Sequence, residues 1–216
     1  MTPRSPQEAP SRLDFWQALS GAVLALFICV HLVLEGSVVL SPKITDWIGW
    51  FMEEIYLAQV AAPLILLIIV LHFWIAARKM PFRAGELRVY FQHSRELGDA
   101  DTSLWLVQVV TATIILVGAF FHVYSVMIDM PLEVDKSAIR LHEGWVVFYV
   151  FFLPACILHT GIGVYRIGVK YGLISRARRE FWRKTIWIVM GAYLLLGTCS
   201  ITRVWFIGDA LIQAVQ

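Results

Sequence analysis

The chain is poor in charged residues and in cysteine. Only 16% of its 216 residues are charged, and its three cysteines are Cys29, Cys156 and Cys199. Each cysteine lies alone in an apolar run, so the sequence has no disulfide framework, no C-x-x-C motif and no C-x-x-C-H motif for covalent heme attachment. We interpret all three as buried thiols. Polar sequence sufficient for a separate soluble domain is also lacking, so we expect a single domain over residues 1–216.

Apolar sequence dominates instead. Hydrophobic residues make up 59% of the chain, and the mean hydropathy is +0.70. A helix needs about 20 largely apolar residues to cross a bilayer, and five such runs lie at about 17–40, 52–77, 104–128, 144–168 and 185–207. They predict an all-α integral membrane protein with five transmembrane helices, the first four forming a bundle and the fifth packing outside it. The first run is too long for the apolar core of a signal peptide, so we expect no cleavable signal.

Basic residues are distributed unevenly between the two sides of this predicted bundle. With the N-terminus in the cytoplasm, all but four of the 18 lysines and arginines fall inside; the four are Lys43, Lys136, Arg140 and Arg203. The positive-inside rule therefore predicts a cytoplasmic N-terminus and a periplasmic C-terminus. We also expect short amphipathic surface helices at 86–97 and 172–184. These are either a solvated, lipid-facing basic surface or a docking platform for soluble subunits.

Four of the six histidines lie in apolar runs, one in each of the first four predicted helices: His31, His72, His122 and His159. Ionisable side chains inside a membrane are costly and rare. At about 1.5 Å per residue, His31 and His122 lie in the outer half of the bundle, and His72 and His159 in the inner half. Two pairs at two depths predict two bis-histidine b-type hemes. Zinc is disfavoured, because separated pairs lack the three or four convergent ligands that it takes.

Cations follow the inner pair of histidines along the same helix faces. Lys79 comes seven residues after His72, and Arg166 and Lys170 come seven and eleven residues after His159. Long basic side chains can reach the membrane interface. We therefore expect these three to pair with the propionates of the inner heme.

The first and third helices carry matching polar residues. Gln17 and Ser20 precede the histidine of their helix by 14 and 11 residues, and Gln108 and Thr111 do the same on theirs. Both sets lie at the depth of the inner heme, so we interpret them as its surroundings. Polar side chains that hold neighbouring helices together are the alternative.

Four stretches around the histidines are distinctive: LDFWQ at 13–17, LHFWIAARKMP at 71–81, DTSLWLVQ at 101–108 and LHTGIGVYRIGVKYG at 158–172. Together with the histidine spacing, they resemble the diheme cytochrome b membrane subunit of bacterial menaquinol:fumarate reductases and related succinate:quinone oxidoreductases. The likeness runs from Leu13 to about Arg203. It implies the same pairing, with His31 and His122 on the outer heme iron and His72 and His159 on the inner. Trp105, in the third stretch, is a further candidate for the heme surroundings.

The resemblance implies a membrane anchor and electron-transfer subunit of a quinol:fumarate reductase in the bacterial inner (cytoplasmic) membrane. Menaquinol would be oxidised near the outer heme. Electrons would pass through both hemes to an iron–sulfur subunit and a flavoprotein on the cytoplasmic side, in a complex that could dimerise. The chain has no cysteine cluster and no G-x-G-x-x-G motif, so fumarate chemistry is expected on the partners. We expect no nucleic-acid partner.

Quinol oxidation needs a proton acceptor near the outer heme. The resemblance implies Glu53 or Glu54, and Glu53 is preferred because it keeps the family's separation from His31. Glu35, four residues after His31 on the same helix face, is a weaker candidate. For each of them the alternative is an ordinary interface carboxylate. Ile157 stands where some members of the family have a glutamate of a transmembrane proton path, so we expect turnover to separate charge.

Three other interpretations stay open. The same subunit could serve succinate:quinone reduction, because the reverse reaction uses the same parts. A diheme anchor of another quinone-linked dehydrogenase, such as a hydrogenase or a formate dehydrogenase, is disfavoured because those proteins tend to place two histidines close together on one helix. From a different class, the chain could be a small transporter or a structural anchor without a cofactor.

Overall fold

The computed structural model describes residues 11–79, 89 and 100–216. Within these residues the protein is helical and contains no β-strand. Five stretches are long and apolar enough to cross a membrane: Arg12–Val39, Leu57–Ala77, Ser103–Ile128, Val134–Lys170 and Arg176–Val215. The predicted class, an all-α integral membrane protein with five transmembrane helices, is confirmed.

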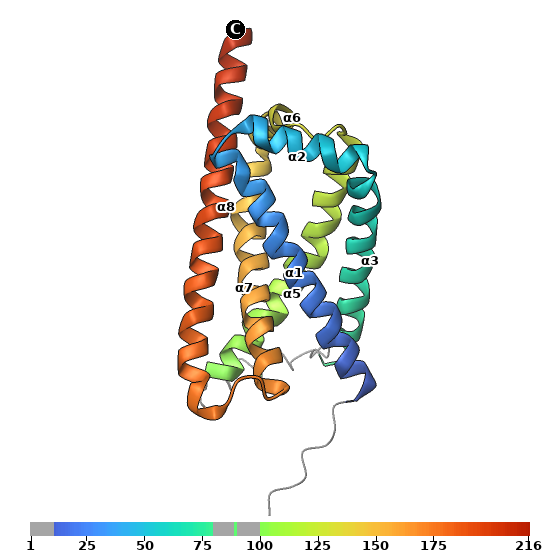
Figure 1. The fold of residues 1–216 in the computed structure, drawn as a ribbon, viewed down its shortest axis with the longest axis vertical. Helices are drawn as coiled ribbons and strands as arrows, with labels where there is room; N and C mark the ends of the chain where they lie inside the picture. The colour runs from blue at the N-terminus through green and yellow to red at the C-terminus, as the bar shows by residue number, and fades with distance from the viewer. Residues whose placement is uncertain (1–10, 80–88, 90–99) are drawn as a thin grey trace, which may run out of the picture.

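Four of the long helices form a closed ring: α1 (Arg12–Gly36), α3 (Leu57–Ala77), α5 (Ala100–Ile128) and α7 (Val146–Lys170). Helix α1 packs on α3, α3 on α5, α5 on α7, and α7 on α1 (Figure 1). Helix α8 (Arg179–Val215) packs against α7 and α1 from outside the ring, as predicted for the fifth helix. Large apolar side chains cover the outer surface of the ring, as a lipid environment requires.

Two shorter helices cover one end of the ring (Figure 1). Helix α2 (Pro42–Glu54) follows α1 through the short η1 helix (Ser37–Val39). Helix α6 (Val134–Arg140) continues into α7 through a π-helical stretch, η2 (Leu141–Trp145). The carboxylate of Asp46 on α2 accepts a hydrogen bond of 2.8 Å from the backbone N–H of Val134 on α6. We call this the capped end, and the opposite end, which carries Arg78, Lys79 and Lys170, the basic end.

The second transmembrane helix begins later than the sequence predicts. Residues 52–54 belong to α2, and α3 begins at Leu57. Between them Tyr56 adopts a left-handed conformation, with φ 58°. A residue other than glycine seldom takes this conformation, and a helix cannot continue through it. The expected continuous helix 52–77 is therefore wrong at its first turn.

The fifth transmembrane helix is longer than the predicted 185–207. Its 37 residues give α8 a length of about 55 Å, well beyond the roughly 30 Å of a bilayer core, and its C-terminal end projects past the capped end (Figure 1). The surface helix expected at 172–184 is also wrong. Residues 172–175 form turns and bends, Arg176–Arg178 form the short η3 helix, and the remainder begins α8. The other expected surface helix, 86–97, falls outside the described residues except at position 89.

Candidate functional site

A cavity of about 890 Å³ runs through the ring of helices. It reaches from Asp14 and Lys79 at the basic end to Asp46 and Lys136 at the capped end. Its volume is within the range of about 300–1,000 Å³ that is typical of ligand and cofactor pockets. Most of the side chains singled out in the sequence line it: Gln17, His31, Glu35, His72, Lys79, Trp105, Gln108, His122, His159, Arg166 and Lys170.

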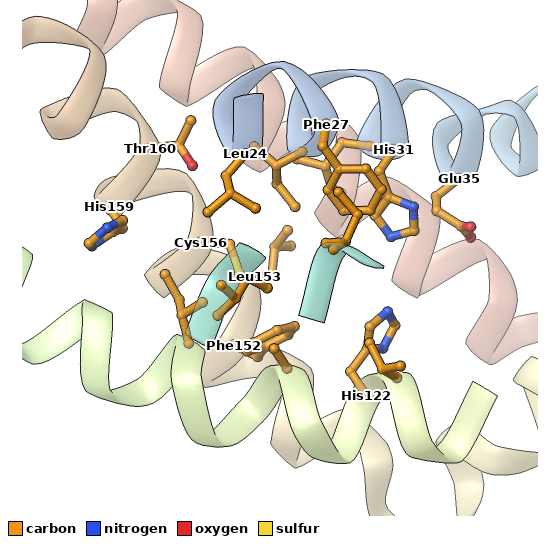
Figure 2. A pocket seen from close by; sticks show the side chains of 18 of the residues that line it. Leu24, Phe27, His31, Glu35, His122, Phe152, Leu153, Cys156, His159 and Thr160 are labelled. Atoms are coloured by element: carbon orange, nitrogen blue, oxygen red, sulfur yellow. The ribbon is translucent and has the colours of Figure 1, made fainter. Parts of the chain in front are cut away.

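His31 on α1 and His122 on α5 face each other across the half of the cavity nearer the capped end (Figure 2). Their ring centres are 6.0 Å apart. The His31 ring stacks on Phe27, with centres 5.4 Å apart and planes 9° from parallel. The Nδ1 atom of His122 lies 3.1 Å from the hydroxyl of Tyr149 on α7. These neighbours hold both rings in defined orientations toward the cavity.

His72 on α3 and His159 on α7 both line the cavity nearer the basic end. The Nδ1 atom of His72 lies 2.8 Å from the Ser20 hydroxyl on α1. The Nδ1 atom of His159 lies 3.2 Å from the Thr111 hydroxyl on α5. The structure therefore places His31 beside His122, and His72 and His159 line the same cavity nearer the basic end. The role of these histidines as ligands stays a prediction at this point.

The space between the two pairs is lined by apolar side chains. Figure 2 shows Leu24, Phe27, Phe152, Leu153 and Cys156 between the level of His159 and that of His31 and His122. Gly21 lines the cavity beside His72. A Cβ atom at this position would lie 3.0 Å from Cε1 of His72. The absence of a side chain there leaves room for the imidazole.

Asp14 forms ion pairs with three cations at the basic end. Its carboxylate binds Arg78, Lys79 with an Nζ–Oδ1 distance of 2.6 Å, and Lys170 with an Nζ–Oδ2 distance of 3.1 Å. The Tyr171 hydroxyl donates to the Asp14 backbone oxygen at 3.2 Å. Both lysines that are expected to meet heme propionates therefore share an acidic partner, which joins the ends of α1, α3 and α7.

The three candidate carboxylates for quinol chemistry occupy different places at the capped end. Glu35 lines the cavity near His31 (Figure 2). Glu53, at the end of α2, is half-buried, and its carboxylate accepts a hydrogen bond from the backbone N–H of Leu132, a residue of the cavity wall. Glu54 is exposed, and neither Glu53 nor Glu54 itself lines the cavity.

The residues around the cavity fit the predicted hemes. Metal–imidazole bonds are about 2 Å long and a ring centre lies about 1 Å behind its nitrogen, so two imidazoles on one iron have centres about 6 Å apart. The His31–His122 separation of 6.0 Å matches this requirement. Cations at both ends of the cavity suit propionates. A cluster of three or more His, Cys, Asp or Glu ligands, as zinc would take, does not occur in the described part of the chain.

Several residues of the site escaped the sequence analysis. Phe27 precedes His31 by four residues, so helical spacing could have found it. Asp14 and Tyr149 contact side chains on other helices, and no spacing along the chain reports such a contact. Arg140 was considered only for orientation, yet it lines the cavity at the capped end and pairs with Asp129.

The chain is similar to one described protein family and to individual known proteins. A family described as the succinate dehydrogenase/fumarate reductase transmembrane subunit matches residues 87–199. A fumarate reductase cytochrome b subunit from Helicobacter pylori is 30% identical over 201 residues, covering 88% of this chain and 78% of that protein. The fumarate reductase cytochrome b subunit from Wolinella succinogenes is 25% identical over 207 residues, covering 89% of this chain and 80% of that protein.

Proposed function

Because the chain belongs to the transmembrane-subunit family of succinate dehydrogenases and fumarate reductases, we propose that it anchors a quinol:fumarate reductase in the membrane and carries its electrons. Menaquinol is oxidised at the capped end, and electrons leave at the basic end toward an iron–sulfur subunit and a flavoprotein. Two b hemes supply the one-electron chemistry between the two ends when bound. Succinate oxidation is the same path in reverse. The names of both relatives favour fumarate reduction.

The observation that carries this proposal is one cavity lined by four histidines, in which the rings of His31 and His122 have centres 6.0 Å apart. His31 and His122 hold the iron near the capped end, and His72 and His159 the iron near the basic end. Imidazole is a common protein ligand of heme iron. Each histidine comes from a different helix of the ring. The packing of these helices on one another therefore also fixes where each imidazole lies.

At the basic end we assign the propionate contacts to Lys79, Arg166 and Lys170. Lys79 and Lys170 lie within bonding distance of one carboxylate already, that of Asp14, which shows that both ammonium groups can reach the same anion. Gln17, Trp105 and Gln108 line the cavity at this level and complete the polar surroundings. Asp14 orients the lysines and limits the net positive charge around the cofactor.

At the capped end we assign proton acceptance from quinol to Glu53, with Glu35 as the second candidate. The Glu53 carboxylate accepts a hydrogen bond from the backbone N–H of Leu132, and Leu132 lines the cavity. The capped end faces the periplasm and the basic end the cytoplasm, in the bacterial inner membrane. This orientation follows the basic residues, because Arg78, Lys79, Arg166 and Lys170 gather where the positive-inside rule places them.

The test is the heme content of the purified complex and of single histidine variants. The complex is expected to show b-type absorption bands with two hemes per chain. His31→Ala should lose the centre near the capped end and keep the other, and His72→Ala should do the opposite, because each removes one of two ligands from one iron. Reduced-minus-oxidised spectra and a redox titration measure both.

His142→Gln is the matched control. His142 stacks on Trp205 of α8, with ring centres 3.8 Å apart, and does not line the cavity. This variant should keep both centres. A complex without heme, or one in which His31→Ala and His72→Ala remove the same centre, would contradict the proposed function.

A further inference from the structure

Two helix hydroxyls make the same set of contacts on opposite sides of the cavity. The Ser20 Oγ atom lies 2.7 Å from the backbone oxygen of Trp16, four residues earlier on α1, and 2.8 Å from Nδ1 of His72 on α3. The Thr111 Oγ1 atom lies 2.7 Å from the backbone oxygen of Val107, four residues earlier on α5, and 3.2 Å from Nδ1 of His159 on α7. The matched spacing seen in the sequence is thus a repeated contact between neighbouring helices.

The direction of these hydrogen bonds follows from the number of protons available. A hydroxyl has one hydrogen to donate and two lone pairs to accept with, and a backbone carbonyl can only accept. Each hydroxyl therefore gives its hydrogen to its own helix. Toward the histidine it can only accept, so Nδ1 of the imidazole carries the proton.

The backbone supports the same assignment independently. The Gln108 carbonyl oxygen lies 3.2 Å from Nδ1 of His159. A carbonyl oxygen is a second acceptor for the same N–H. Both imidazoles near the basic end are therefore held as the Nδ1–H tautomer, which leaves the lone pair of Nε2 for a metal.

We propose that Ser20 and Thr111 are positioning residues that set the reduction potential of the centre at the basic end. The inference rests on the proposed assignment of His72 and His159 as iron ligands. An imidazole that donates its Nδ1–H to an acceptor is a more basic ligand, which favours the ferric over the ferrous state and lowers the potential. The other pair is held differently, by the Tyr149 phenol and by stacking on Phe27, so this effect belongs to one centre.

The test compares Ser20→Ala, Thr111→Val and the double variant in the whole complex by redox titration. The centre in question is the one that His72→Ala removes. In the double variant its equilibrium constant for reduction should rise by about tenfold, which is 59 mV for one electron. Each single change should give less, because it alters the hydrogen bonding of only one of the two histidines. The ferric electron paramagnetic resonance signal of the same centre should shift, because each imidazole loses a hydrogen-bond acceptor that orients it.

Two further variants separate this role from a structural one. Ser20→Thr keeps the hydroxyl and should restore the potential. Thr113→Val removes a hydroxyl that also bonds its own helix, to Val109 at 3.2 Å, but is exposed, and should change nothing. Selective loss of the basic-end centre in Ser20→Ala or Thr111→Val also supports positioning. An unchanged or lowered potential with both hemes present overturns the inference, as does loss of both centres. A wild-type complex without heme refutes the proposed function instead.

Discussion

Glu53 lies where helix α2 ends and the chain turns into the membrane. Its carboxylate accepts a hydrogen bond from the N–H of Leu132, a residue that lines the cavity, so it joins α2 to the loop before α6. A glutamine there keeps an oxygen for the same hydrogen bond but has no basic oxygen to take a proton from quinol. The structural and the chemical roles of this residue can therefore be separated by one substitution.

Glu53→Gln is expected to lower kcat for menaquinol oxidation by about 10²-fold or more, the usual contribution of a proton acceptor. Fumarate reduction driven by a dye that reduces the soluble subunits directly should be unaffected. Glu54→Gln is the control, because Glu54 is exposed whereas its neighbour Glu53 is half-buried. If Glu35→Gln abolishes quinol oxidation and Glu53→Gln does not, the proton acceptor is Glu35.

At this scale the sequence predicted the residues whose chemistry conflicts with their surroundings. A histidine in an apolar helix stands out, and depth along the helix is enough to sort four of them into two pairs. Asp14 and Tyr149 did not stand out, because an acid near a helix start and a tyrosine in an apolar run are ordinary there. Their roles depend on how neighbouring helices are rotated, as the distances to Lys170 and His122 show.

The helical elements were predictable where they span the bilayer and not where they lie across its end. Helices α2 and α6 have 13 and 7 residues, too few to be recognised as apolar runs of membrane length. Helix α2 instead carries Trp47, Trp50 and Phe51 exposed, as helices at a membrane interface do. The break at Tyr56 that separates α2 from α3 occurs without a glycine or proline, the residues that usually indicate a helix break in a sequence.

Gly208 decides how closely α6 approaches α8. A Cβ atom at this position would lie 2.6 Å from the Ala138 backbone oxygen and 2.7 Å from Cδ2 of His142. A backbone atom cannot move away from the added Cβ as easily as the end of a flexible side chain can. Gly208→Ala should therefore destabilise the purified complex by about 1–3 kcal/mol, measured as a lower midpoint of thermal unfolding. Gly191→Ala, on the same helix with nothing within 4 Å of its added Cβ, should leave the midpoint unchanged or raise it. Equal losses in both variants would contradict the close contact.

Across the whole molecule, the wall between the two histidine levels offers no carboxylate. Among the residues that the structure describes, no Asp or Glu lies at this depth. Ile157 is 5% exposed and packs with Leu153 and Met190 in an apolar cluster that α1 and α8 complete through Leu32 and Tyr193. Protons from quinol therefore have no acidic relay toward the basic end along α7.

Turnover is consequently expected to separate charge. In the proposed reaction, protons from menaquinol are released at the capped end while two electrons per quinol move to the basic end. Proteoliposomes that contain the complex should therefore develop a membrane potential that is negative on the side of the soluble subunits. A potential-sensitive dye measures it, and an uncoupler should abolish the signal while speeding turnover. His31→Ala, which lacks the centre near the capped end, should give no menaquinol-driven potential yet still reduce fumarate with electrons from a viologen. Sustained menaquinol oxidation without any potential would show that protons cross with the electrons, by a route that does not use acidic side chains of the described helices.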